Sequence, residues 1–132
     1  GYILDVAHNP AAISKLLEYI DLSSCNGKIY CLFSVMTDKE VTQMIRACTG
    51  RFEGWFLGDQ PEVPRACTAQ FLADVLRSEG NQVISTSEDL PQAFRSAQSA
   101  MSAGDTLVVF GSFFTVAAVL PLLDEDRRKS TP

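Results

Sequence analysis

Histidine is almost absent from this sequence, and His8 is the only one in 132 residues. The four cysteines, Cys25, Cys31, Cys48 and Cys67, form no CxxC pair. Zinc sites are built from clustered Cys and His ligands, so this composition disfavours one. Free cysteines are typical of a reducing compartment, and we therefore expect a cytoplasmic protein without disulfides in which Cys31 and Cys48 are buried.

Long apolar runs, basic patches and phosphate-binding motifs are also missing. No stretch approaches the about 20 apolar residues that span a bilayer. The net charge of −5 comes without a basic face that includes aromatic residues, so neither a membrane nor a nucleic acid is an expected partner. Neither GxGxxG nor GxxxxGK[ST] occurs, which excludes a dinucleotide fingerprint and a P-loop within this sequence.

The sequence does contain a regular alternation of short apolar strands and amphipathic helices. After a first strand that ends at Leu4, we expect strands at 28–35, 54–57, 82–85 and 106–110. Apolar residues at i, i+3, i+4 and i+7, as between Ile13 and Ile20, indicate the helices. This alternation predicts an α/β fold with one open, mostly parallel sheet flanked by helices on both faces.

The length and the 46% hydrophobic content suit a single domain, which we place at residues 1–123. Its core should include Trp55, at a strand centre, and the Phe113-Phe114 pair. Pro121 is expected to kink or end the last helix, and the charged segment 124–132 is expected to fray. Because the sequence begins within a strand, we expect it to be one domain of a longer protein.

The turn after the first strand contains a carboxylate and an imidazole, Asp5 and His8. Asn9 is a favoured helix N-cap and Pro10 suits the first helical position, so a helix should begin here. In parallel sheets, ligands bind at the carboxyl ends of the strands, where helix N–H groups favour anions. Asp5 and His8 are therefore candidate ligand-binding residues. Asp5 could equally cap the helix or shape the turn, and a lone histidine at a helix start is more often structural.

Further polar residues follow the other strands and should line the same edge of the sheet. They are Ser34, Thr37, Asp38, Lys39, Asp59, Arg65 and Ser112. A cation there, Lys39 or Arg65, could pair with a substrate carboxylate. Each residue also has an ordinary explanation: Asp38-Lys39-Glu40 fits the charged first turn of a helix capped by Thr37 or Asp38, and the cations fit a solvated surface.

Four of these segments together resemble one enzyme family. Residues 5–10, Asp-Val-Ala-His-Asn-Pro, are similar to the D-x-A-H-N-P signature of folylpolyglutamate synthase and dihydrofolate synthase, members of the Mur ligase superfamily. Asp38-Lys39-Glu40 resembles the family's D-K-[DE] element, Pro64-Arg65 resembles a P-R element of bacterial members, and 111–116 resembles its G-S-x-x-x-V close. Only the first motif is specific, but all four occur in the family's order along the whole chain.

The resemblance implies the C-terminal, Rossmann-like domain of a three-part ligase. In that family, ATP activates the carboxylate of dihydropteroate or a folate as an acyl phosphate, and the amino group of L-glutamate attacks it. A central ATPase domain of the same polypeptide holds the P-loop and the magnesium, so we expect no catalytic or metal-binding residue in this chain, which alone should be inactive. ATP binding maps onto Asp5, His8 and Asn9, and possible glutamate or substrate contacts fall at Asp38, Lys39, Arg65 and Ser112.

Two other classes of protein stay open at this point: a stand-alone, doubly wound nucleotide-sensing module and a noncatalytic protein-interaction domain. A P-loop in the preceding reading frame would favour the ligase over both. The motifs do not distinguish a parent that makes dihydrofolate from one that extends polyglutamate tails, or one that does both.

Overall fold

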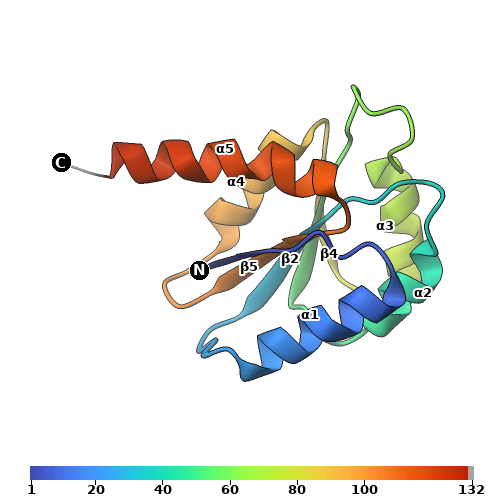
Figure 1. Ribbon diagram of the computed structural model, residues 1–132, viewed down its shortest axis with the longest axis horizontal. Helices are drawn as coiled ribbons and strands as arrows, with labels where there is room; N and C mark the ends of the chain where they lie inside the picture. Colours follow the sequence, from blue (N-terminus) through green and yellow to red (C-terminus); the bar gives the residue numbers. More distant parts are fainter. Residues whose placement is uncertain (131–132) are drawn as a thin grey trace.

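The computed structural model describes residues 1–130 as three layers, with one sheet between two layers of helices (Figure 1). The strands are β1 (Tyr2–Leu4), β2 (Ile29–Phe33), β3 (Gly54–Gly58), β4 (Val83–Ser87) and β5 (Thr106–Phe110). They lie in the order β1-β5-β2-β3-β4, and each pairing between neighbours is parallel. The predicted α/β sheet is confirmed, and it is parallel throughout.

Within residues 1–130, five helices connect and cover the strands: α1 (Pro10–Leu22), α2 (Val41–Ala47), α3 (Ala69–Ser78), α4 (Leu90–Ala100) and α5 (Phe113–Lys129). Buried side chains of α1, α2 and α3 pack on one face of the sheet, and those of α4 and α5 pack on the other. Most helices begin as local chemistry predicts, because the side chains of Asn9, Thr68, Asp89 and Ser112 accept backbone N–H bonds as N-caps.

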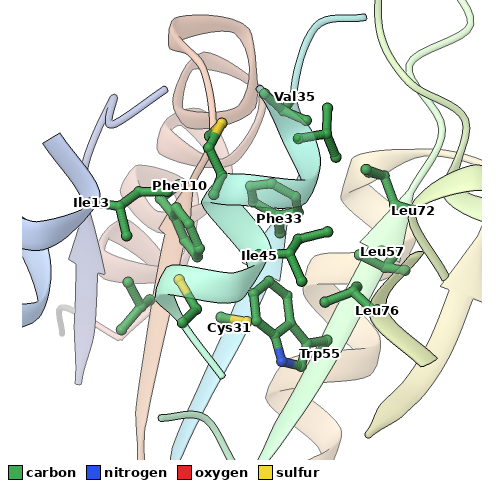
Figure 2. Close-up of a cluster of buried hydrophobic side chains, with 14 of the residues drawn as sticks. Ile13, Cys31, Phe33, Val35, Ile45, Trp55, Leu57, Leu72, Leu76 and Phe110 are labelled. Atoms are coloured by element: carbon green, nitrogen blue, oxygen red, sulfur yellow. The ribbon is translucent and has the colours of Figure 1, made fainter. Parts of the chain in front are cut away.

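Aromatic rings from three neighbouring strands fill the core beneath α1, α2 and α3 (Figure 2). Trp55 is fully buried, as predicted, and its ring meets Phe33 edge-on at 5.5 Å between centroids. Cys31 and Cys48 are buried free thiols, which also confirms the prediction. Burial raises the pKa of Cys48 to about 12 and raises that of Cys31 well above its ordinary value, so both thiols stay protonated.

The last helix differs from expectation in its length. It continues past Pro121 to Lys129, so residues 124–129 are helical rather than frayed, and residues 131–132 of the expected tail lie outside the described part. A proline removes one intrahelical hydrogen bond, here to the carbonyl of Ala117. Both Ala117 and Pro121 are exposed, so water can satisfy that carbonyl and the helix need not end.

The Phe113-Phe114 pair is not part of the core, contrary to prediction. The two side chains are 69% and 50% exposed. The buried side of α5 is the row Thr115, Val119 and Leu123, spaced four residues apart. In a helix with 3.6 residues per turn, the two positions just before Thr115 fall outside that row, so the phenylalanines project away from the sheet.

Candidate functional site

All of the candidate residues lie at the carboxyl edge of the sheet. Because the five strands are parallel, the segments after β1, β2, β3 and β5 emerge at one edge. The β1–α1 turn contains Asp5, His8 and Asn9, and the remaining candidates, Asp38, Lys39, Arg65 and Ser112, lie in the three loops after β2, β3 and β5. The hydrogen bonds of each loop decide which of these groups can still meet a ligand.

In the β1–α1 turn, Asp5 shapes the turn but does not cap the helix. Its Oδ1 accepts the backbone N–H of Ala7 at 2.8 Å, whereas the helix cap is Asn9, whose Oδ1 accepts the N–H of Ala12 at 2.8 Å. Within residues 1–130, Oδ2 of Asp5 has no hydrogen-bond partner. The half-buried carboxylate is therefore held in place by one oxygen and presents the other.

His8 is exposed and oriented by its own turn. Its Nδ1 lies 2.8 Å from the carbonyl oxygen of Val6. A carbonyl oxygen can only accept, so Nδ1 is the protonated nitrogen and, in the neutral ring, Nε2 is left as an acceptor. The turn thus presents one carboxylate oxygen and one imidazole nitrogen beside the N-terminus of α1.

The loops after β2 and β3 are joined along their backbones. Thr37 N–H is donated to Arg65 O at 2.7 Å, and Cys67 N–H is donated to Val35 O at 2.8 Å. The first of these bonds holds Thr37, and Asp38 lies in the turn that the Lys39 N–H closes on Met36 O, so α2 begins only at Val41 and not at these predicted caps. The backbone pairing therefore holds the side chains of the two loops close together.

One carboxylate in these joined loops lies beside two cations. Arg65 Nη2 donates to Asp38 Oδ2 at 2.9 Å, and Lys39 Nζ lies 4.0 Å from the same oxygen. Partial desolvation opposes ionisation of Asp38, but the Arg65 hydrogen bond and the charges of Lys39 and Arg65 outweigh it and hold its pKa below the ordinary value. The result is an exposed cluster that can accept a further carboxylate on its two cations.

Ser112 lies at the same edge, but it is buried and its hydroxyl proton is used within the protein. Its Oγ accepts the N–H of Thr115 at 3.1 Å and lies 2.9 Å from Thr115 Oγ1. Because Thr115 Oγ1 donates its own proton to Ser34 O at 2.8 Å, Ser112 must be the donor in the pair. The hydroxyl of Ser112 therefore cannot donate to a ligand without losing this internal bond.

Sequence reasoning missed two residues of this edge, Thr115 and Gln60. Thr115 links the β5–α5 turn to the end of β2, and Gln60 Nε2 donates to Ser34 Oγ at 2.8 Å. The Ser-x-x-Thr spacing at 112–115 fits an N-cap and could have indicated the contact of Thr115 with Ser112. No local pattern indicates the two contacts with Ser34, which lies 81 positions from Thr115 and 26 from Gln60.

A cleft of about 480 Å³ lies next to these loops, between the segment after β3 and the starts of α4 and α5. Its walls include Gln60, Leu90 and the exposed Phe114. Across residues 1–130, no group of three or more His, Cys, Asp or Glu side chains is placed to hold a metal ion. No helix in that range is long and apolar enough to cross a membrane.

Known proteins share both the sequence pattern and the fold. The sequence model of the family described as Mur ligase, glutamate ligase domain, matches residues 1–113. The dihydrofolate synthase/folylpolyglutamate synthase of Escherichia coli K12 is 31% identical over 125 residues, which cover 95% of this chain and 28% of that protein. The enzyme of the same name from Buchnera aphidicola subsp. Acyrthosiphon pisum is 29% identical over 120 residues, covering 91% of this chain and 28% of that protein.

Solved structures agree with the sequence comparison. E. coli FolC in complex with DHPP and ADP superposes with a TM-score of 0.83 at 31% identity, covering 96% of this chain and 29% of that chain. A bifunctional folylpolyglutamate synthase/dihydrofolate synthase with Mn, AMPPNP and L-glutamate bound gives a TM-score of 0.80 at 31% identity, covering 93% of this chain and 29% of that chain. This chain therefore spans less than a third of the length of these relatives. With residues 1–113 matched, it belongs to the Mur ligase, glutamate ligase domain family.

Proposed function

We propose that this chain is the C-terminal domain of an ATP-dependent ligase that adds L-glutamate to dihydropteroate, to folyl polyglutamates, or to both. The observation that carries the proposal is the presence, at the same edge of the sheet, of an unpartnered Asp5 oxygen and of the cations Lys39 and Arg65. Relatives bound to ADP, or to AMPPNP and L-glutamate, support it. The rest of such an enzyme, including a central ATPase domain, would lie on sequence outside this chain.

On the nucleotide side, Asp5 is proposed to accept hydrogen bonds from ribose hydroxyls of ATP, as an acidic residue does in dinucleotide folds. The free Oδ2 is the atom available for this contact. His8 would contribute its Nε2, and Asn9 would act mainly by capping α1, whose N-terminus favours nearby phosphates. The magnesium ion that accompanies ATP would be bound by the central domain.

On the amino-acid side, Lys39 and Arg65 are proposed to bind a carboxylate of glutamate. Asp38 holds both cations at the edge before the substrate arrives. Bidentate Arg–carboxylate contacts are strong and directional, which suits recognition of a small dicarboxylic amino acid. Ser112 would shape this side of the site through the turn that it caps, because its own hydroxyl is occupied.

The proposed reaction forms one amide bond for each ATP consumed. The carboxylate of the folate substrate attacks the γ-phosphorus, and ADP leaves. The nitrogen of glutamate then bonds to the acyl carbon, phosphate leaves and the nitrogen loses a proton. A domain that closes over the nucleotide excludes water, which would otherwise hydrolyse the acyl phosphate. We place this activity in the cytoplasm, in line with the free cysteines.

The Asp5→Asn variant of the full-length protein tests the nucleotide role. Asn9, not Asp5, caps α1, and an amide can still accept the N–H of Ala7, so thermal stability should be nearly unchanged. The amide lacks the charge and the second acceptor. Since hydrogen bonds to charged groups contribute about 1.5–3 kcal/mol, kcat/KM for ATP should fall about ten- to a hundredfold. Unchanged kinetics at unchanged stability would contradict the assignment.

A further inference from the structure

Ser34, at the end of β2, is the point where three loops of the carboxyl edge meet. It is fully buried. Its Oγ accepts Gln60 Nε2 from the loop after β3, and its carbonyl accepts Thr115 Oγ1 from the start of α5, both at 2.8 Å. The backbone of the β5–α5 turn also passes so near that a Cβ on Gly111 would lie 2.1 Å from Ser34 O.

Gln60 differs in its surroundings from Ser34 and Thr115, the other two residues that these side-chain hydrogen bonds connect. It is half-buried, and it borders the cleft next to the site. Its side chain makes a single hydrogen bond, the one to Ser34. Within the described chain, Gln60 is neither a helix cap nor one of the buried residues.

The bond from Gln60 to Ser34 lies at the inner end of the loop that contains Lys39, which is where this loop leaves β2. From Ser34 this loop runs outward to Lys39, and the backbone bonds of Val35 and Thr37 attach it to Cys67 and Arg65, near the far end of the loop after β3. The Gln60 amide attaches the same two loops at their inner end. The loop with Arg65 is thus attached to the loop with Lys39 near both of its own ends, by the Gln60 side chain at its start and by backbone bonds at Arg65 and Cys67.

We propose that Gln60 is a positioning residue for glutamate: through the Ser34 hydroxyl it sets the spacing of the loops that hold Lys39 and Arg65. The proposal rests on the function proposed above, since it names a further residue of the same site. Gln60 need not touch the substrate. Its loss should weaken the binding of a ligand that bridges the two loops and should leave the β1–α1 turn, where Asp5 lies, unaffected.

The test compares KM for glutamate with KM for ATP in the full-length protein. One net hydrogen bond contributes about 0.5–1.5 kcal/mol, so Gln60→Ala should raise the glutamate KM about two- to tenfold with the ATP KM unchanged. Ser34→Ala removes the same bond from the other side and should give a similar increase. The double variant should be no worse than either single one, because both remove one contact. Gln70→Ala, which deletes an exposed glutamine bonded to Asp74 on α3, is the matched control.

A second readout does not depend on activity. Amide hydrogen exchange of residues 35–39 should be faster in Gln60→Ala than in the unmodified chain, while α1 exchanges at the same rate. An unchanged glutamate KM, equal increases in both KM values, or additive effects in the double variant would each overturn the positioning role. If Gln60→Ala fails to fold, the Ser34→Ala comparison decides the question alone. A full-length protein that has no glutamate-dependent turnover at all would instead overturn the proposed function, and this proposal with it.

Discussion

The polar side chains of the carboxyl edge fall into two groups, according to whether their internal hydrogen bonds leave a polar atom available for a ligand. Asp5 and His8 each use one polar atom to fix their own turn and leave another available. Ser112 and Thr115 use their hydroxyl protons within the protein. Motif position alone does not reveal this difference, because Asp5 and Ser112 follow strands in the same way. We therefore propose ligand contacts for the first group and a role in loop geometry for the second.

Replacing Lys39 or Arg65 by alanine should affect one substrate only. If either cation binds a glutamate carboxylate, its loss in the full-length protein should raise the glutamate KM about ten- to a hundredfold, the range for a hydrogen bond to a charged group. The ATP KM should change little, because Asp5 lies in another loop. Steady-state kinetics with each substrate varied in turn measures both values.

Arg77→Ala, on the exposed face of α3, serves as the control for loss of a positive charge. An equal rise in both KM values, or no rise, would remove that cation from the glutamate site. Both cations contact Asp38, so their single effects need not add in a double variant.

Among the elements, the β5–α5 turn has the strictest backbone requirement. Gly111 has φ of 121°, and a Cβ there would lie 2.1 Å from the carbonyl oxygen of Ser34. Backbone strain of this kind costs about 1–3 kcal/mol, and the clash with a main-chain atom adds to it. Gly111→Ala should therefore lower the free energy of unfolding by more than strain alone, as measured by urea denaturation.

Gly80→Ala supplies the matched comparison for that prediction. Gly80 also has positive φ, 82°, but a Cβ at this position would have no neighbouring atom within 4 Å. The variant should show the cost of strain without the clash. If the two variants are equally destabilised, the close approach of the β5–α5 turn to β2 contributes nothing, which would contradict the packing described for this edge.

Local sequence patterns predicted the elements well because caps and apolar spacing are local properties. Asn9 begins a helix as expected, and the apolar side chains between Ile13 and Ile20 form its buried face. The patterns failed where distant segments decide. The placement of β5 between β1 and β2 depends on pairing between segments far apart in the sequence, and the late start of α2 depends on the bond from Thr37 to Arg65. The Gln60–Ser34 bond was not predicted because it also joins residues that are far apart in the sequence.

At the scale of the whole molecule, the chain contains residues proposed to bind the substrates but not the motif expected for the ATP chemistry. The chain contains the edge with Asp5, Lys39 and Arg65, and it contains no P-loop sequence. It also spans only 28% of the length of the E. coli relative. The motifs and the relatives therefore both support the proposal that this is a substrate-binding and closing domain that works with a partner domain for ATP chemistry.

The measurement that tests the central claim most directly is glutamate-dependent ADP release, followed together with amide formation, in the full-length protein and in this chain alone. The full-length protein, given ATP, magnesium, L-glutamate and dihydropteroate or a folate, should release one ADP and one phosphate for each amide formed. This chain alone should fold and release none. ATP hydrolysis by this chain in a sample free of contaminating enzymes, or ADP release by the full-length protein that does not depend on glutamate, would contradict the assignment of this domain to glutamate ligation.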